Sequence, residues 1–278
     1  GQAGDSGVLV LAEGTQITIA DTRKGKDAEG NPTSDIVHIP APGQEDRVAQ
    51  LTPGKAVTAR IDWERLHRMM RLHTTSHLLC HVVPQLVNGC SITPDYARLD
   101  FAMTDPLDKE QLTAAIATLV AAAHPLTVAS ISDEELDANP ALVKSMSVQP
   151  PRGTGRIRTI RIGGEGDAPL IDLQPCGGTH VANTAEIGAI VVTKIEKKSA
   201  TPGGGVLGFA PGAQRMALFF GGHSVAHSAS GGTPKAASCP PPPAGWCWAL
   251  SHERSEQRFS LGCTHWRAAP VGAHQKLH

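Results

Sequence analysis

The first part of the chain contains short apolar runs that turn-forming residues separate. Four of these runs are rich in β-branched side chains, at positions 8–11, 15–20, 35–39 and 56–61. Gly, Pro and Asn lie between them, for example Gly-Asn-Pro at 30–32. Short β-branched runs bounded by turn residues are typical of strands. The pattern therefore predicts a small all-β unit over residues 1–61.

Two helices are predicted after this unit. Asp62 is a favoured N-cap residue and Pro84 ends a helix, so residues 63–83 should form one long helix. Asp105 followed by Pro106 predicts the start of the second helix, with Pro at its first helical position. Apolar residues recur along this second helix at the spacing of one face, namely Leu112, Ala115, Ile116, Leu119, Val120 and Ala123.

Strands and helices alternate over the middle of the chain. Ser-Asp-Glu-Glu at 132–135 is typical of a helix start. Further strands are predicted at 98–102, 126–131, 156–162, 170–173 and 187–195. Helices interspersed with strands and joined by short connections indicate an α+β fold. We therefore expect residues 62–199 to form an α+β domain, in which helices pack against a β-sheet, beside the β unit.

The last part of the chain differs in composition from the rest. Residues 1–199 hold 43 charged residues, whereas residues 200–278 hold only 8, together with 20 Gly and Pro. Such a composition buries too little apolar surface to offset the entropy of ordering the chain. It predicts a disordered or non-native tail over 200–278, with a small loop-rich appendage as the alternative.

The whole chain has 278 residues and a formal net charge of −1, which excludes a polybasic tail as the basis of nucleic-acid binding. No run of eighteen apolar residues occurs, so no membrane-spanning helix is expected. Six scattered cysteines form no dense disulfide framework, which indicates a reducing, cytoplasmic setting. The first five residues do not resemble a signal peptide and include no Met, so we expect a truncated N-terminus.

The first chemical motif is His-Thr-Thr-Ser-His at 73–77, inside the long predicted helix. His73 and His77 lie on one helical face, so both imidazoles can reach a single metal ion. Zinc metalloproteases use the same spacing, but Thr74 stands where their general base Glu is found, which argues against that class. A satisfied core histidine is the alternative for either residue. Which pair of histidines would bind the metal stays open here, because His77 and His81 are also four residues apart.

The second chemical motif is Cys-Gly-Gly-Thr-His at 176–180, after the strand predicted at 170–173. Two glycines supply unusual backbone angles and allow close approach, so Cys176 and His180 can face one ion. Alone, this pair is a weak signal, because a free Cys is often just a small buried hydrophobe. Together with two helical histidines, it completes a tetrahedral set of three nitrogens and one sulfur that suits Zn²⁺.

The distance between the two motifs along the chain bears on the kind of site. A compact zinc finger has its ligands close together, so a site that joins two elements of a packed domain fits better. Four protein ligands are typical of structural zinc sites, whereas catalysis needs a position for water. Spacing alone leaves both roles open. A hydrolase that uses Cys176 with His180 is a further alternative, but it shows no third, orienting group.

Several linked motifs follow one another along residues 1–199. They are His-Thr-Thr-Ser-His-Leu-Leu at 73–79, Arg-Leu-Asp-Phe at 98–101, Cys-Gly-Gly-Thr-His-Val at 176–181, Thr-Ala-Glu-Ile-Gly at 184–188 and Ile-Glu-Lys-Lys at 195–198. In this combination the sequence resembles the alanyl-tRNA editing (AlaX) family, relatives of the editing domain of alanyl-tRNA synthetase. A similar domain serves threonyl-tRNA synthetase. Residues 1–7 resemble the end of the family's glycine-rich motif.

The resemblance implies a domain organisation and a reaction. Residues 1–61 would be a truncated, barrel-like β unit, residues 62–199 the zinc-binding editing domain, and residues 200–278 the tail. The protein would be an aminoacyl-tRNA deacylase, a hydrolase that needs no ATP. It would remove serine, or glycine, from mischarged tRNA(Ala) in the cytoplasm.

The resemblance also implies the metal ligands, and it excludes His81 as one of them. It places Zn²⁺ on four side chains, His73, His77, Cys176 and His180. No carboxylate lies in the motifs as an obvious base, so a zinc-bound water is the expected catalytic group. Rejecting alanine while accepting serine requires a polar partner for the serine hydroxyl. The candidate hydroxyls are those of Thr74, Thr75, Ser91 and Thr93.

Basic residues of the long helix are candidates for contacts with tRNA. Arg65, Arg68 and Arg71 could meet tRNA phosphates, with a solvated helix face as the alternative. At 199–203 the chain departs from the family's basic stretch, and residues 206–210 are the remaining candidate for its last strand. A non-catalytic tRNA-binding protein and a structural zinc protein are the alternatives to a deacylase.

Overall fold

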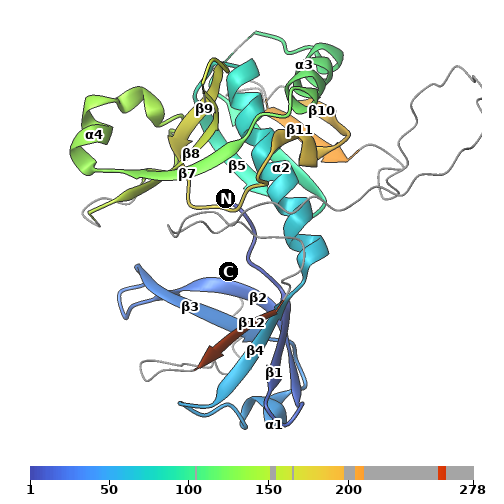
Figure 1. Cartoon of the computed structure of the whole chain (residues 1–278), viewed down its shortest axis with the longest axis vertical. Coiled ribbons are helices and arrows are strands. Elements are labelled where there is room, and N and C mark those ends of the chain that lie inside the picture. Colours follow the sequence, from blue (N-terminus) through green and yellow to red (C-terminus); the bar gives the residue numbers. More distant parts are fainter. Residues whose placement is uncertain (104, 151–154, 165, 197–203, 210–255, 261–278) are drawn as a thin grey trace, which may run out of the picture.

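The computed structural model describes residues 1–103, 105–150, 155–164, 166–196, 204–209 and 256–260. Helices and strands are interspersed along these residues, and the strands pair antiparallel in three sheets, which confirms the α+β fold. One sheet lies apart from the other two, and helix α2 (Trp63–Val82) extends from it toward them (Figure 1). Among the described residues, two separate hydrophobic cores follow the same division.

The first sheet contains the short apolar runs from the start of the chain. Its order is β12-β4-β1-β2-β3, with β1 (Gly7–Leu11), β2 (Gln16–Lys26), β3 (Pro32–Pro40), β4 (Ala56–Ile61) and β12 (Glu256–Ser260). The short helix α1 (Glu45–Val48) precedes β4, and the small core consists of Leu9, Leu11, Ile17, Ile19, Leu51 and Val57. All four predicted strands are confirmed, and three of them are longer than predicted. The barrel-like character of this unit and its boundary at residue 61 stay predictions.

Helix α2 begins and ends where the sequence predicts. The carboxylate of Asp62 accepts a hydrogen bond from the backbone N–H of Arg65, and Val83 follows the last turn. Every residue from 72 to 80 is buried, because α3, η2 and strands of the other two sheets surround the helix. A helix that is buried on all sides must satisfy its polar side chains inside the protein. The motif at 73–77 lies in this buried part.

The other two sheets and their helices surround α2. The four-stranded sheet has the order β10-β11-β6-β5, and the three-stranded sheet has the order β7-β8-β9. Their elements are β5 (Val87–Ile92), β6 (Tyr96–Phe101), α3 (Lys109–Ala121), β7 (Leu126–Ile131), α4 (Asp133–Ala138), η1 (Pro140–Leu142), β8 (Ile157–Gly163), β9 (Leu170–Pro175), η2 (Thr184–Ile187), β10 (Ile190–Glu196) and β11 (Gly204–Phe209). Helix α3 packs against α2 and β10.

The structure corrects the predicted start of the second helix. Asp108, not Asp105, is the N-cap of α3, and its carboxylate accepts from the N–H of Gln111 at 2.7 Å. Leu107 packs against the core, and Asp108 after it still has an extended backbone. Leu112 and Ile116 of the predicted apolar stripe are buried, and Leu119 and Val120 pack against the same core. Ala123 does not belong to the stripe, because α3 ends at Ala121 and Ala123 is exposed.

Two further differences concern the strands. Strand β5 is not predicted by the sequence, because its Asn, Gly, Cys and Ser residues hide the apolar alternation. The strand predicted at 187–195 begins only at Ile190, because residues 184–187 form a 3₁₀ turn. The predicted helix start at 132–135 is confirmed, with Ser132 and Glu135 forming a reciprocal capping box.

Two strands come from the segment predicted to be a tail. Strand β11 lies between β10 and β6 and pairs with both, so the last strand predicted at 206–210 is present with slightly different bounds. Strand β12 pairs with β4 at the edge of the first sheet. Residues 210–255 and 261–278, and with them most of the tail prediction, lie outside the described residues.

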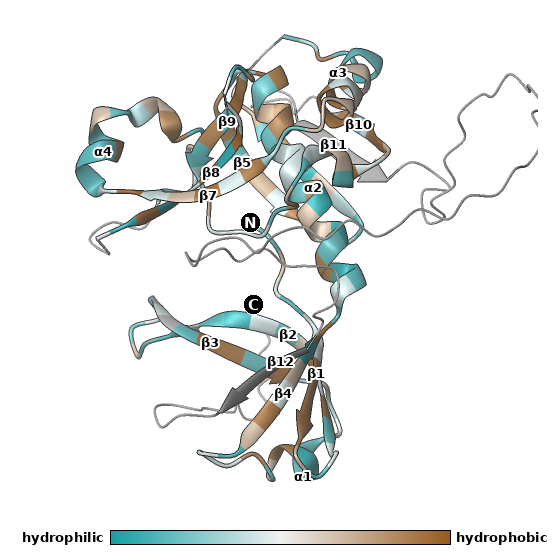
Figure 2. Ribbon diagram, in the orientation of Figure 1, coloured by the Kyte–Doolittle hydropathy of each residue, from teal (hydrophilic) through white to brown (hydrophobic). Residues whose placement is uncertain are grey.

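Hydrophobic residues gather where elements face one another. Figure 2 shows them on α3 and the adjoining β10, and on β1 and β4 of the first sheet. The larger core contains Leu72, Leu78 and Leu79 of α2, each without exposed surface. Within the described part of the chain, no helix has both the length and the apolar character that crossing a bilayer requires.

The N-cap of α2 leads to a first prediction. Asp62→Ala removes the acceptor of the Arg65 N–H and should lower the free energy of unfolding by about 1 kcal/mol. Asp62→Ser keeps an oxygen at the cap and should cost only a few tenths of a kcal/mol. Urea denaturation of both variants measures the difference. Equal stabilities would show that the cap does not stabilise the helix.

Candidate metal centre

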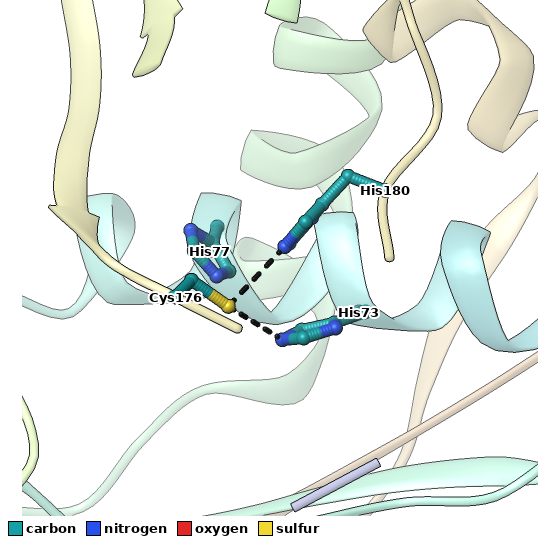
Figure 3. Close-up of side chains that lie close together, drawn as sticks. All are labelled: His73, His77, Cys176 and His180. Atoms are coloured by element: carbon teal, nitrogen blue, oxygen red, sulfur yellow. Dashed lines mark hydrogen bonds between the residues drawn. The ribbon is translucent and has the colours of Figure 1, made fainter. Parts of the chain in front are cut away.

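Four side chains from the two sequence motifs converge at one point. Helix α2 presents His73 and His77 one turn apart, and the turn after β9 presents Cys176 and His180 (Figure 3). One ligand atom from each side chain lies within 4.8 Å of those of the other three. The alternative pair of metal ligands, His77 with His81, is wrong, because His81 is exposed and lies outside this group.

The chemistry and spacing of these donors fit a zinc ion. The Sγ of Cys176 lies 3.4 Å from Nε2 of His73 and 3.4 Å from Nε2 of His180. Sulfur and nitrogen ligands of a tetrahedral zinc ion, at their usual bond lengths, are about 3.5 Å apart. Three imidazoles and one thiolate are a donor set that zinc prefers.

Each of the three imidazoles has a polar partner at Nδ1, the ring nitrogen that faces away from the centre of the cluster. Nδ1 of His73 lies 2.9 Å from Oε1 of Gln2, and Nδ1 of His180 lies 3.2 Å from Oγ1 of Thr74. Nδ1 of His77 lies 2.8 Å from a carboxylate oxygen of Asp172. An acceptor at Nδ1 places the proton there and leaves the lone pair of Nε2 for a metal. The three partners therefore orient the rings for coordination.

The side chain of Arg158 holds the turn that contains Cys176, and the turn needs a glycine at position 178. Arg158 donates from Nη1 to the carbonyl oxygens of Cys176, at 2.5 Å, and of Gly178, at 2.9 Å. A Cβ atom on Gly178 would lie 2.1 Å from Cε1 of His73. Neither Gly178 nor Gly177 has a positive φ, so close approach, not unusual backbone angles, requires the glycine at 178.

The electrostatics of the cluster favour the metal-binding forms of Cys176 and His180. Burial acts to raise the pKa of Cys176, but hydrogen bonds from His180, His73 and His77 outweigh it and lower the pKa to about 2. Burial lowers the pKa of His180 to about 3, and the charge of His77 contributes to this. Thiolate and neutral imidazole are the forms that coordinate a metal. At His77, burial acts to lower the pKa, but hydrogen bonds with Asp172 and Cys176 outweigh it and raise the pKa to about 9.

The structure distributes the four candidate hydroxyls differently. Thr74 touches the cluster, through His180, and its oxygen also accepts from the N–H of Val181. Thr75 donates to the carbonyl of Arg71 within the helix, and Thr93 makes a local turn with Asp95 and Tyr96. Ser91 is exposed on β5. Only Thr74 of these four is brought against the metal-binding candidates.

The arginines of α2 all contact backbone carbonyls. Arg65 donates to Gly4, Arg68 to Pro94, and Arg71 to Ile187. These bonds attach the N-terminal segment, the β5–β6 turn and η2 to the helix. The three side chains therefore hold the fold around α2, and a contact with tRNA phosphates stays a prediction.

Sequence reasoning missed three residues of this site. Gln2 and Asp172 hold two of the imidazoles, and Lys144 donates to Asp172 at 2.5 Å. The one usable signal was Asp172 itself, an acidic residue among the apolar residues of the strand predicted at 170–173. Nothing in the local pattern around Gln2 or Lys144 points to the site, because their partners are far away along the chain.

Comparison with known proteins finds relatives that cover most of this chain. Residues 157–201 match the family model described as the threonyl and alanyl tRNA synthetase second additional domain. The alanyl-tRNA editing protein AlaX-M of Saccharolobus solfataricus is 32% identical over 198 residues, which are 70% of this chain and 76% of that protein. AlaX-M of Methanosarcina acetivorans is 27% identical over 206 residues, 71% of this chain and 78% of the relative.

Longer proteins match as well. The alanine–tRNA ligase of Metallosphaera sedula is 31% identical over 206 residues, which are 71% of this chain but only 20% of the ligase. The fold and the cluster define an α+β protein with a three-histidine, one-cysteine candidate metal centre, related to a domain of tRNA synthetases. Within that class, the chain belongs to the alanyl-tRNA editing protein family.

The close contact at Gly178 leads to a second prediction. Gly178→Ala places a methyl group against His73 and Oε1 of Gln2, so the ring must move. We expect zinc affinity to fall by about 10-fold or more, the usual effect of disturbing the partner of a ligand. Gly177→Ala is the matched control, because nothing lies within 4 Å of a Cβ there. Competition with a chelator measures both; equal affinities would contradict the close approach.

The adjacent threonines of α2 give a third prediction. Thr74→Val removes the partner of His180 and of the Val181 N–H, and it should cost about 1–3 kcal/mol of stability. Thr75→Val removes only a bond to the helix backbone and should cost less. Denaturation and zinc titration separate the two variants, since only Thr74→Val should also weaken zinc binding. A larger loss of affinity in Thr75→Val would reject this assignment.

Proposed function

We propose that the chain is a zinc-dependent aminoacyl-tRNA deacylase, which hydrolyses the ester bond of tRNA(Ala) mischarged with serine or glycine. The observation that carries the proposal is the convergence of four metal-binding side chains from two distant motifs. The relatives named alanyl-tRNA editing proteins support tRNA(Ala) as the partner. The proposed setting is the cytoplasm, because the substrate is a charged tRNA.

His73, His77, Cys176 and His180 would hold the zinc ion in this proposal. When bound, zinc supplies a Lewis acid that polarises a water molecule or the ester carbonyl. The chain's own residues keep the rings aligned and the thiol ionised. Gln2, Thr74 and Asp172 fix the three imidazoles, and Arg158 fixes the turn of Cys176.

The two sides of the cluster differ in exposure, which bears on where a substrate enters. His73 and His77 are 9% and 5% exposed, whereas Cys176 and His180 are half-buried and Gly177 is exposed. The turn side therefore faces the surface, and the helix side faces the core. We infer that the aminoacyl end of the tRNA approaches along the turn at 176–180.

Discrimination between serine and alanine requires a polar group for the serine hydroxyl. Thr74 lies against the cluster, but its oxygen is engaged by His180 and Val181. Thr75 is turned to the backbone of α2. We therefore assign Thr74 to holding His180. The hydroxyl of Thr93 is likewise engaged, with Asp95 and Tyr96, so Ser91 is the candidate that we keep for a substrate contact.

A structural zinc protein is the second candidate, and one observation favours it. Four protein side chains already complete a tetrahedral set, which is the usual composition of a structural site. A non-catalytic tRNA-binding protein would share the same centre. Turnover separates both from a deacylase.

The fourth prediction tests the proposed reaction directly. We expect the protein to release serine from mischarged tRNA(Ala), and a chelator or Cys176→Ala to lower the rate by at least about 100-fold, more than loss of an outer partner costs. Cys90→Ala is the matched control, because Cys90 is an exposed free cysteine outside the cluster. Its rate should equal that of the wild type.

The other outcomes distinguish the competing functions. Binding of tRNA(Ala) without release of serine or glycine would indicate a tRNA-binding protein. One zinc per chain without tRNA binding would indicate a structural zinc protein. Full activity of Cys176→Ala would reject the ligand set.

A further inference from the structure

Asp172 is a buried carboxylate beside the candidate metal centre. It lies on β9, faces α2, and its side chain has no exposed surface. One oxygen accepts from Nδ1 of His77 and from Nε2 of Gln174, both at 2.8 Å. The other oxygen accepts from Nζ of Lys144 at 2.5 Å. A buried charge with this many partners is held in one orientation.

The partner of His77 differs in kind from those of the other two imidazoles. Gln2 offers an amide oxygen to His73, and Thr74 offers a hydroxyl to His180, so both of those partners are neutral. Asp172 offers a charged oxygen. Hydrogen bonds to a charged acceptor are roughly twice as strong as neutral ones. Because an ionised carboxylate can only accept, it also fixes the proton of His77 on Nδ1.

Lys144 reaches Asp172 from a segment that lies outside the two metal motifs. The carbonyl of Lys144 accepts from the N–H of Val87, and the N–H of Met146 donates to the carbonyl of Val87. These two bonds attach residues 144–146 to Val87 of β5. The lysine is therefore fixed at its backbone, and its ammonium group compensates the buried carboxylate.

We propose that Asp172, held by Lys144 and Gln174, is a positioning residue that presents Nε2 of His77 to the metal. The inference rests on the proposed function only in its metal: it requires that the cluster binds zinc, not that the protein hydrolyses tRNA. It adds a charged outer partner, and through Lys144 a third segment of the chain, to the two motifs that contain the ligands.

Asp172→Asn tests this role, because the amide keeps the shape of the side chain and removes its charge. We expect the affinity for Zn²⁺ to fall by about 10–100-fold, the usual cost of losing an outer partner of a metal-bound histidine. Asp100→Asn is the matched control, since Asp100 also pairs with a basic side chain, Arg98, but lies outside the cluster. Its zinc affinity should be unchanged. Chelator competition measures the affinity.

A second variant separates positioning from stability. Asp172→Asn leaves the ammonium of Lys144 without its carboxylate, so the protein itself could become less stable. The double variant Asp172→Asn, Lys144→Met removes both charges. We expect it to be more stable than the single variant without metal, and to show the same loss of zinc affinity. The absorption of the Co²⁺-substituted proteins reports whether the tetrahedral, thiolate-containing coordination is altered in both.

Each outcome decides between this inference and the proposed function. Wild-type affinity in both Asp172 variants would overturn the positioning role and leave the deacylase proposal intact. Weak affinity in both, with no deacylation by the wild type, would support the positioning role and reject the deacylase. A wild-type protein that binds no zinc would reject both.

Discussion

The structure depends on burying three imidazoles and one thiolate at the same place. A buried polar atom without a partner costs free energy, so every nitrogen and the sulfur must be satisfied. The chain satisfies the outer nitrogens with Gln2, Thr74 and Asp172, which come from three different segments. The remaining ring nitrogens and the sulfur of Cys176 face one another, and a metal ion would complete this arrangement.

This requirement explains the position of α2. Residues 72–80 of the helix are buried because the N-terminal segment, β9 and η2 all contact α2 around the motif at 73–77. The same contacts anchor the turn at 176–180, through Arg158 and through the N–H of Thr179, which donates to Gln2. The candidate centre is thus complete only when segments more than 170 residues apart are folded together.

Features that depend only on residues close together along the chain could be predicted from the sequence. The caps at Asp62 and Ser132 and the His and Cys spacings follow from local geometry, and all are present. The start of α3 was misplaced, because Asp105 and Asp108 are equally good caps locally, and the packing of Leu107 decides between them. The outer partners Gln2 and Lys144 could not be predicted, since their contacts depend on the assembled fold.

The contrast between the two sides of the cluster bears on the choice between a structural and a catalytic centre. On the helix side, His77 is buried and held by a charged carboxylate at 2.8 Å. On the turn side, His180 is half-buried and held by a neutral hydroxyl at 3.2 Å. A purely structural site gains nothing from one half-buried side whose histidine has only a neutral partner. An enzyme needs such a side, because its substrate must reach a centre whose remaining ligands stay fixed.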